Sequence, residues 1–497
     1  MVFSSHAFLF YFLPLILALY YAAPRRGRHA VLAVLSYAFY GWANPLFVLL
    51  LLGSTVVDYC CGLVIAGRGP VWTARIAGRR DLARAWAIPA PTLPAGARAG
   101  RQRIAVAVSV CANLSLLGFF KYFNFGVDNW NATIMALGLE TLRLETALRV
   151  TLPLGISFYT FQSMSYTIDV YRGHAAALRN FVDFACYVSM FPQLVAGPII
   201  RFSEIAGQLA RRRHTVTRFA RGAAFVSVGL AKKVLLANPC GRVADLAFGA
   251  GAVGTLEAWY GAVAYAFQIY FDFSAYSDMA IGLGLMLGFV FPKNFDSPYQ
   301  AASVTEFWRR WHISLSSWLR DYLYIPLGGS RAGVARTYGN LAVVMLLGGL
   351  WHGAAWNFVV WGGLHGGLLA AERTLGGRAF YAAFPRPMRV AATFGILLVT
   401  WVFFRADDLP AALAYLASMA GLADAPGAAG VLAGLLYEPY SVATVGIAAL
   451  VTWRAPQTWD WSRRLTGWRS ATAVALFAVS AAVLATQAYN PFIYFIF

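Results

Sequence analysis

The 497-residue sequence is poor in charge and in cysteine. Charged residues make up 12% of the chain, and 21 acidic residues stand against 40 lysines and arginines. The five cysteines lack CxxC pairs and the Cys/His spacing of a metal site, so we expect neither a disulfide framework nor a zinc centre. They are Cys60, Cys61, Cys111, Cys186 and Cys240. All lie in or beside apolar segments, where they are expected to pack as small hydrophobic side chains.

Long apolar segments fill most of the chain. Hydrophobic residues make up 59% of it and the mean hydropathy is +0.59, which excludes a soluble domain of this length. The lengths of the apolar runs predict an all-α polytopic integral membrane protein. The formal charge of +19 lies mostly in short segments between these runs. We therefore interpret it as a positive-inside topology signal and expect no nucleic-acid binding.

The positions of the arginines predict the topology. Residues 68–103 carry eight arginines against the single acid Asp81, which predicts a basic cytoplasmic loop. Residues 7–22 are followed by basic residues and are expected to be a retained first span. The stretch 30–67 must then cross twice, with its turn at GWANP. Further spans are predicted near 104–124, 151–171, 222–240, 257–291 and 470–488, with a re-entrant segment or hairpin at 181–200.

We expect about ten to twelve transmembrane helices, together with re-entrant and interfacial helices, from these lengths. They are expected to form one membrane-embedded domain over residues 1–497. The chain is predicted to cross its membrane many times, with the basic loops in the cytoplasm.

His352 lies at the centre of the apolar run GNLAVVMLLGGLWHGAAWNFVVWGGLHGG, which contains no acid, lysine or arginine. Basic residues flank this region on both sides, so residues 338–372 are expected to enter the membrane from the cytoplasm and return. A helix from Tyr338 would rise only about 20 Å before His352, against a hydrocarbon core of about 30 Å. This predicts that His352 lies at the tip of a hairpin inside the membrane. It is either a functional ionisable group or a structural histidine hydrogen-bonded between helices.

His365 follows thirteen residues later, among glycines that favour close helix packing. We interpret it as structural. A haem or metal site made of His352 and His365 is disfavoured, because no His/Glu/Cys cluster has the usual ligand spacing, and no metal is expected.

A second group of polar residues occupies 291–331, where charge returns together with Trp308, Trp311 and Trp318. Tryptophans and arginines together are typical of the membrane interface, and we predict an amphipathic helix of about fifteen residues beginning after Ser303 or Thr305. Glu306 and Arg310 can pair across one turn, and His312 and Ser316 share a face. The helix either only anchors the chain, or its arginines bind an anionic cofactor on the cytoplasmic side. These arginines are Arg309, Arg310, Arg320 and Arg331.

Two carboxylates, Asp272 and Asp278, interrupt the apolar run QIYFDFSAYSDMAIG. On a helix, Tyr270, Ser274 and Asp278 would share one stripe while Asp272 points elsewhere. Carboxylates in such a run need partners. They either form a buried polar network that fixes the helix packing, or one of them orients a catalytic histidine.

Several stretches together resemble the membrane-bound O-acyltransferase family, in its bacterial branch typified by the alginate O-acetyltransferase membrane subunit. They occur in family order over nearly the whole chain. The matching stretches are MVFSSHAFLFYFLPL, PLGISFYTFQSMSYTIDVYRG, FPQLVAGPI, GLAKKVLLAN, IYFDFSAYSDMAIGLG, the segment 291–331, GGLWHGAAWNFVVWGGLHG, TWVFFRA and PFIYFIF.

The resemblance implies which residues form the site. The two histidines characteristic of the family match His312 and His352, the second being regarded as catalytic, and this makes 291–372 the catalytic-core segment. Glu306, Asp321 and the turn Gly328-Gly329 also match the family pattern. The family fold implies helices around a central tunnel.

The resemblance also implies the reaction. An acetyl group would pass from a cytoplasmic thioester such as acetyl-CoA, with no tightly bound cofactor, to a hydroxyl reached from the other side. His352 would be the general base, and His312 would position the donor, orient the acceptor or assist proton movement. Cations that would attract the donor phosphates are Lys232, Lys233, Arg309 and Arg310.

Family members imply partners as well. These are periplasmic acetyl-transfer proteins, an exported polysaccharide such as alginate, another exopolysaccharide or a cell-wall glycan, and the lipids of the bacterial inner membrane. Two other classes of function stay open. One is a transporter or flippase of a sugar or lipid intermediate, with His352, Asp272 and Asp278 as a proton relay. The other is a non-catalytic scaffold of a polysaccharide-modifying complex.

Overall fold

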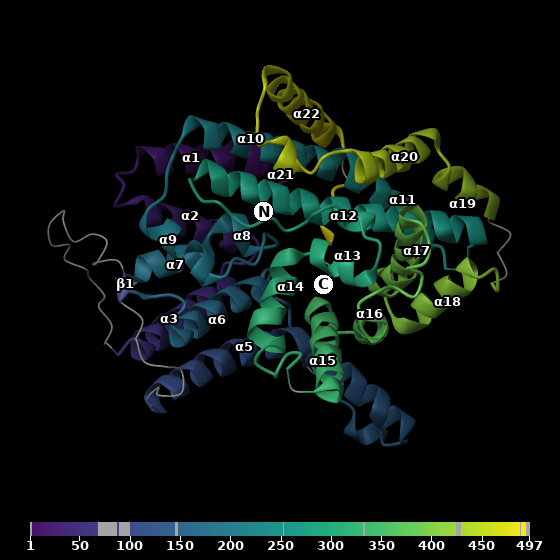
Figure 1. The fold of residues 1–497 in the computed structure, drawn as a ribbon, viewed down its shortest axis with the longest axis horizontal. Helices are drawn as coiled ribbons and strands as arrows, with labels where there is room; N and C mark the ends of the chain where they lie inside the picture. The colour runs from purple at the N-terminus through teal and green to yellow at the C-terminus, as the bar shows by residue number, and fades with distance from the viewer. Residues whose placement is uncertain are drawn as a thin grey trace. The chain divides into compact units, whose positions relative to one another are not determined.

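The computed structural model describes residues 2–67, 87–88, 100–144, 148–251, 253–331, 333–423, 429–487 and 489–493. Their regular secondary structure is helical, apart from two antiparallel strands of two residues each, β1 (Ala87–Ile88) and β2 (Ala177–Leu178) (Figure 1). The prediction of an all-α protein is confirmed. Most of the predicted basic loop 68–103 lies outside the described residues.

The chain forms two compact units. The first contains Met1–Phe219 and Gly284–Phe291, and the second contains Ala220–Leu283 and Pro292–Phe497. The helices of the first unit are η1 (Ala7–Phe12), α1 (Leu13–Ala22), α2 (Arg28–Gly41), α3 (Leu46–Ile65), α5 (Gly100–Ala136), η3 (Glu140–Leu142), α6 (Ile156–Arg172), α7 (Phe181–Ser189), α8 (Phe191–Leu194) and α9 (Phe202–Ala210).

The second unit holds most of α10 and α12 and all later helices. They are α10 (Val216–Ala231), η4 (Lys232–Ala237), α11 (Asn238–Gly249), α12 (Thr255–Met286), η5 (Pro298–Gln300), α13 (Val304–Arg310), α14 (Ile313–Leu319), η6 (Arg320–Tyr324), α15 (Val334–His352), α16 (Trp356–Thr374), α17 (Arg386–Arg405), α18 (Leu409–Met419), α19 (Ala429–Leu436), α20 (Pro439–Arg454), α21 (Thr458–Trp461) and α22 (Gly467–Thr486).

Several helices are long and apolar enough to cross a membrane. Among the described residues these are α3, α5, α17 and α22, and the bent pair α19–α20 adds a fifth candidate with a 52° bend. The protein is therefore a multi-pass membrane protein, as its composition predicts. The remaining predicted crossings fall on helices that are shorter or less apolar, so the total of about ten to twelve stays a prediction.

The helix boundaries test the predicted spans. α2 ends at Gly41 and α3 begins at Leu46, which confirms the turn at GWANP. The span predicted at 104–124 is longer than expected, because α5 continues for 37 residues to Ala136. At 1.5 Å per residue it extends about 55 Å, well beyond a hydrocarbon core of about 30 Å.

Buried polar contacts hold the first unit together. Asp58 of α3 accepts hydrogen bonds from Ser109 (2.5 Å) and Asn113 (2.8 Å), both on α5. Ser109 also contacts Thr167 of α6 at 2.8 Å. Since a buried carboxylate without partners is costly, these contacts help to fix the packing of the three helices.

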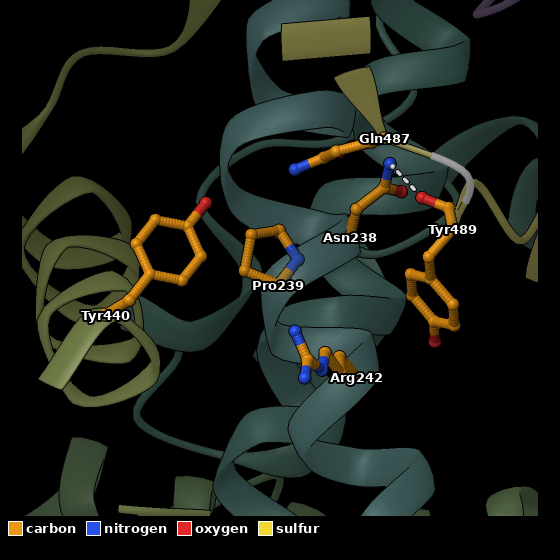
Figure 2. Close-up of a pocket in the computed structure, with 6 residues that line it drawn as sticks. All are labelled: Asn238, Pro239, Arg242, Tyr440, Gln487 and Tyr489. Carbon is orange, nitrogen blue, oxygen red and sulfur yellow. Dashed lines mark hydrogen bonds between the residues drawn. The ribbon is translucent and has the colours of Figure 1, made fainter. Parts of the chain in front are cut away.

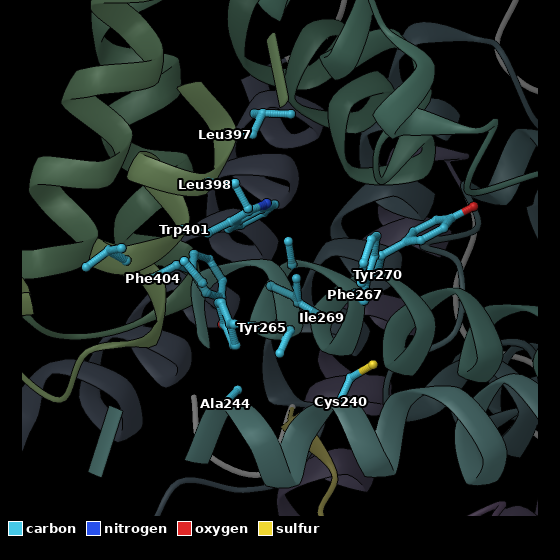
Figure 3. Packing of buried hydrophobic residues seen from close by; sticks show 14 of the residues in the cluster. Cys240, Ala244, Tyr265, Phe267, Ile269, Tyr270, Leu397, Leu398, Trp401 and Phe404 are labelled. Atoms are coloured by element: carbon cyan, nitrogen blue, oxygen red, sulfur yellow. The ribbon is translucent and has the colours of Figure 1, made fainter. Parts of the chain in front are cut away.

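The core of the second unit is built from aromatic and small side chains of α11, α12 and α17. Figure 3 shows Tyr265 and Tyr270 of α12, Trp401 and Phe404 of α17, and Ala244 of α11 in this cluster. Trp401 and Tyr265 are both almost fully buried. Aromatic rings bury large areas with few rotatable bonds, so this cluster is a rigid surface for the side chains packed against it.

Helices α15 and α16 form a hairpin whose backbones touch. A Cβ atom on Gly349 would overlap the carbonyl oxygen of Phe358, and one on Gly362 would overlap that of Met345. Only glycine permits this separation. The predicted hairpin over 338–372 is therefore confirmed as a helical hairpin, with His352 as the last residue of α15.

Two ion pairs join η4 to α12 within the second unit. Lys232 lies 2.7 Å from Asp278, and Lys233 lies 2.7 Å from Asp272. Asp278 also accepts a hydrogen bond from Thr458 at 2.6 Å, and Asp272 accepts one from the backbone of Ile493 at 2.9 Å. Both lysines belong to η4, a π-helical turn. The two carboxylates thus join α12 to η4, to α21 and to the backbone at Ile493.

The hairpin contact predicts the effect of enlarging a glycine. Gly362→Leu should lower the free energy of unfolding by roughly 3 kcal/mol or more, because the α15 backbone must move away. Gly367→Leu is the matched control, since nothing lies within 4 Å of a Cβ at that position of the same helix. Thermal unfolding in detergent measures both variants. Equal melting temperatures for the two would contradict the close approach.

The buried ion pair predicts a second stability effect. Lys233→Met alone should destabilise the protein by roughly 3 kcal/mol, because it leaves the Asp272 carboxylate buried without its cation. Lys233→Met combined with Asp272→Leu should recover much of that loss, since no charge then stays buried. The same unfolding measurement applies. A double variant as unstable as Lys233→Met would show that the unpaired Asp272 carboxylate does not cause the loss of stability.

Candidate active site

His352 lies where α15 ends, inside an aromatic enclosure. The helix stops because Gly353 adopts an extended backbone, and α16 begins at Trp356. The imidazole is buried, with its ring centroid 5.4 Å from that of Trp361 and 5.1 Å from that of Phe404. Apolar walls of this kind exclude water from the surroundings of the imidazole.

The backbone at His312 is left-handed, with φ of 43°, and separates α13 from α14. The predicted start of a helix after Ser303 is confirmed, because Ser303 caps α13. The prediction of one helix of about fifteen residues is wrong, and so is that of His312 and Ser316 on one helical face. Backbone hydrogen bonds explain the break, since Asp296 donates to Arg310 and Ile313 donates to Asn294.

This break aims the His312 side chain into the core of the second unit. Its Nδ1 lies 3.3 Å from Oδ1 of Asn294, and its ring lies 4.6 Å from that of Phe273. Its Nε2 is buried with no hydrogen-bond partner among the described residues. His312 is outside the helices that qualify as membrane spans, and burial lowers the pKa of its imidazole to about 3. The ring is therefore neutral near pH 7.

Trp351 brings the two histidines together. Its indole lies 4.9 Å from the His352 ring and 6.1 Å from the His312 ring, between centroids. The two imidazoles are 40 positions apart in the sequence, yet they share one aromatic neighbour. This arrangement has one group at the end of a hairpin and a second, neutral group beside it. It can remove a proton at one point while holding a reactant at another.

His365 fits the structural interpretation. Its Nδ1 lies 3.3 Å from the indole nitrogen of Trp308, which donates to it, and its ring lies 4.8 Å from Trp361. Trp361 contacts both His352 and His365. No group of three or more metal-ligating side chains occurs in the part of the chain that the structure describes.

Most of the charged residues predicted for the site form ion pairs. Glu306 pairs with Arg310 at 2.8 Å, which confirms the expected pairing, and Asp321 pairs with Arg320 at 2.7 Å. Arg309 is exposed. Lys232 and Lys233 face Asp278 and Asp272 instead of an open surface. Of the four cations expected to attract donor phosphates, Arg309 alone has no ion pair in the described residues.

Sequence reasoning missed Glu372, which holds α13 in place. It is buried at the end of α16 and accepts hydrogen bonds from the backbone nitrogens of Val304 (2.7 Å) and Thr305 (2.8 Å). A carboxylate there satisfies unpaired donors in the first turn of α13. In the sequence, Glu372 stands out as an isolated acid at the end of a long apolar run. Nothing in the sequence indicates that α13 is its partner.

Comparisons with known proteins show the family of this chain. Residues 172–405 match the membrane-bound O-acyltransferase family, a range that contains both His312 and His352. A probable alginate O-acetylase of Azotobacter vinelandii is 47% identical over 85% of this chain and 79% of the relative. A probable alginate O-acetylase of Pseudomonas putida is 43% identical over 100% of both chains. A peptidoglycan O-acetyltransferase of Helicobacter pylori is 36% identical over 85% of this chain and 80% of the relative.

The likeness extends over the helices that build the site. It includes the hairpin that ends at His352 and the broken helix that carries His312. At this identity and coverage, the chain belongs to the membrane-bound O-acyltransferase family, in its alginate O-acetylase branch, and is an O-acyltransferase.

Proposed function

We propose that this enzyme moves an acetyl group from a cytoplasmic thioester, such as acetyl-CoA, to a hydroxyl, and so O-acetylates an exported polysaccharide. The observation that carries the proposal is the pair of buried histidines that both contact Trp351. The related proteins are named for O-acetylation of alginate or peptidoglycan. The acceptor of this chain is accordingly an alginate-like exopolysaccharide or a cell-wall glycan.

His352 acts as the general base in this proposal. Its imidazole takes the proton of the acceptor hydroxyl while the hydroxyl oxygen attacks the thioester carbonyl carbon. The tetrahedral intermediate then expels the thiolate, which receives that proton from His352, so the histidine ends neutral. The rings of Trp361 and Phe404 keep water from competing for the thioester. The products are an acetate ester and a free thiol.

His312 positions a reactant. Asn294 lies beside Nδ1, which leaves Nε2 as the ring nitrogen without a protein partner among the described residues. A neutral imidazole with a fixed tautomer offers one hydrogen bond of defined direction. We assign to it the orientation of the donor or of the acceptor hydroxyl near Trp351.

The donor arrives from the cytoplasmic side. Exposed Arg309 on α13 attracts its phosphates, whereas Arg310, Lys232 and Lys233 are each paired with a carboxylate. The enzyme needs no tightly bound cofactor. It works in the bacterial inner membrane with periplasmic proteins that complete the transfer onto the glycan.

The ion pairs count against the transporter alternative. A proton relay would need Asp272 and Asp278 as exchangeable carboxylates, but each has a lysine at 2.7 Å. No observation favours the scaffold alternative over the enzyme.

The general-base assignment predicts a large loss of activity. His352→Ala should lower the rate of acetyl transfer from acetyl-CoA by at least about 100-fold, the usual contribution of a positioned base. His365→Gln, in the same hairpin, should retain activity within about tenfold. Radiolabelled acetyl transfer by purified protein in detergent measures both. Undiminished activity of His352→Ala would show that His352 is not the general base.

A pH profile separates the two histidines. Because the pKa of His312 is lowered to about 3, this group stays neutral as the pH falls to about 5 and contributes no loss of activity there. His312→Gln should therefore lower kcat/KM and leave the midpoint of the acid limb unchanged. Rates measured from pH 5 to 9 for both proteins test this. A shifted midpoint in the variant would mean that His312 itself titrates in that range.

A further inference from the structure

An apolar groove of about 560 Å³ lies on the helices α1 and α2 in the first unit. It is lined by Leu19, Ala22 and Ala23 at the end of α1 and by alanine, valine and leucine side chains between Ala30 and Leu35 of α2. A second pocket, among α11, α20 and the segment after α22 in the second unit, measures about 230 Å³ (Figure 2). Pockets for organic ligands are typically about 300–1,000 Å³, so the groove on α1 and α2 has the size for one and the second pocket does not.

Arginines lie at one end of this groove. Arg25, Arg26 and Arg28 occupy the turn between the two helices and the first position of α2, directly beside the residues that line the groove. Arg25 and Arg26 are exposed, and neither forms an ion pair in the part of the chain that the structure describes. Residues 1–57 contain no acid, so the two helices and their turn supply no carboxylate that would neutralise these cations.

A distant segment of the first unit adds positive charge at the same end. Tyr20, in the last turn of α1, accepts a hydrogen bond from Nε of Arg212 at 2.9 Å, and the guanidinium of Arg28 lies 5.3 Å from the centroid of the Tyr20 ring. The Tyr20 hydroxyl also lies 3.0 Å from Nε2 of His214. Burial and the positive charges of Arg212, Arg28 and Arg25 lower the pKa of the His214 imidazole. The three arginines are therefore close together in space.

The groove and the arginines together match the two halves of an anionic lipid, an apolar chain and a charged headgroup. The acid Asp183 packs near α2 but is hydrogen-bonded to His29 at 2.6 Å. Clustered cations repel one another, and an anion bound among them would lower that repulsion. The basic turn is cytoplasmic by the positive-inside rule, and anionic headgroups of the cytoplasmic leaflet lie beside such turns.

We propose that this groove binds an acyl chain of an anionic phospholipid, whose phosphate is bound by Arg25, Arg26 and Arg28. Guanidinium groups suit this task because each can donate two hydrogen bonds to one phosphate. The small side chains of the groove, Ala30 among them, leave the space that the acyl chain fills. The site is independent of the proposed acetyl transfer, because none of its residues takes part in that reaction.

The test uses the full-length enzyme, purified in neutral detergent and depleted of lipid. Binding is measured with fluorescent phosphatidylglycerol and with fluorescent phosphatidylcholine that has the same acyl chains. The wild type should bind phosphatidylglycerol about tenfold more tightly or better, because only this headgroup has a net negative charge. Millimolar inorganic phosphate should not displace the bound phosphatidylglycerol, since it has no chain to occupy the groove.

Two variants test the two halves of the site. Arg25→Gln combined with Arg26→Gln should weaken phosphatidylglycerol binding about tenfold or more and leave phosphatidylcholine binding unchanged, because only the interaction with the charged headgroup is lost. Ala30→Trp should weaken phosphatidylglycerol binding although every arginine remains, because the indole occupies the groove. Thermal unfolding shows whether each variant is folded, and Ala30→Leu replaces Ala30→Trp if the larger side chain prevents folding.

Matched controls change the same residue types elsewhere. Arg378→Gln combined with Arg386→Gln removes two exposed arginines of the second unit, and Ala112→Trp adds an indole to an exposed position of α5. Both should bind phosphatidylglycerol as the wild type does. The site is overturned if the wild type binds the two lipids equally, if inorganic phosphate displaces phosphatidylglycerol, or if either groove variant binds it no more weakly than its control.

Discussion

The contact between the backbones of α15 and α16 is the constraint on which the active site depends. Gly349 and Gly362 let the two helices touch, so α15 must end and reverse within a few residues of His352. In an apolar environment, helices gain little from hydrophobic burial and associate through close van der Waals packing and hydrogen bonds. The packed backbones hold the hairpin together near its tip, where the proposed general base His352 lies.

Around that tip, aromatic rings of the second unit contact the two ionisable histidines. Trp351 and Trp361 contact His352, and Trp351 also contacts His312. The carboxylates Asp272 and Asp278 are paired with lysines and join helices, a structural task. These two ion pairs include neither His312 nor His352.

Much of this could be predicted from the sequence. Hydropathy predicts helices, basic residues on both sides of 338–372 predict the hairpin, and the i,i+4 spacing predicts the pair Glu306–Arg310. The prediction failed at His312, where the sequence pattern predicted one continuous helix. The backbone instead bonds to Asn294 and Asp296, and such contacts between distant segments override local preference. Glu372 was missed for the same reason, because its partner lies 67 and 68 positions earlier in the chain.

The sequence by itself determined that the protein is a helical membrane protein and which histidines to consider, because composition and motif spacing are local properties. Only the tertiary structure decided that Lys232 and Lys233 face carboxylates, that Trp351 contacts both histidines, and that Arg405 at the end of α17 pairs with Asp245 of α11. These facts arise where helices from distant parts of the chain meet. Their side-chain contacts depend on how the helices rotate and approach one another, which no local pattern encodes.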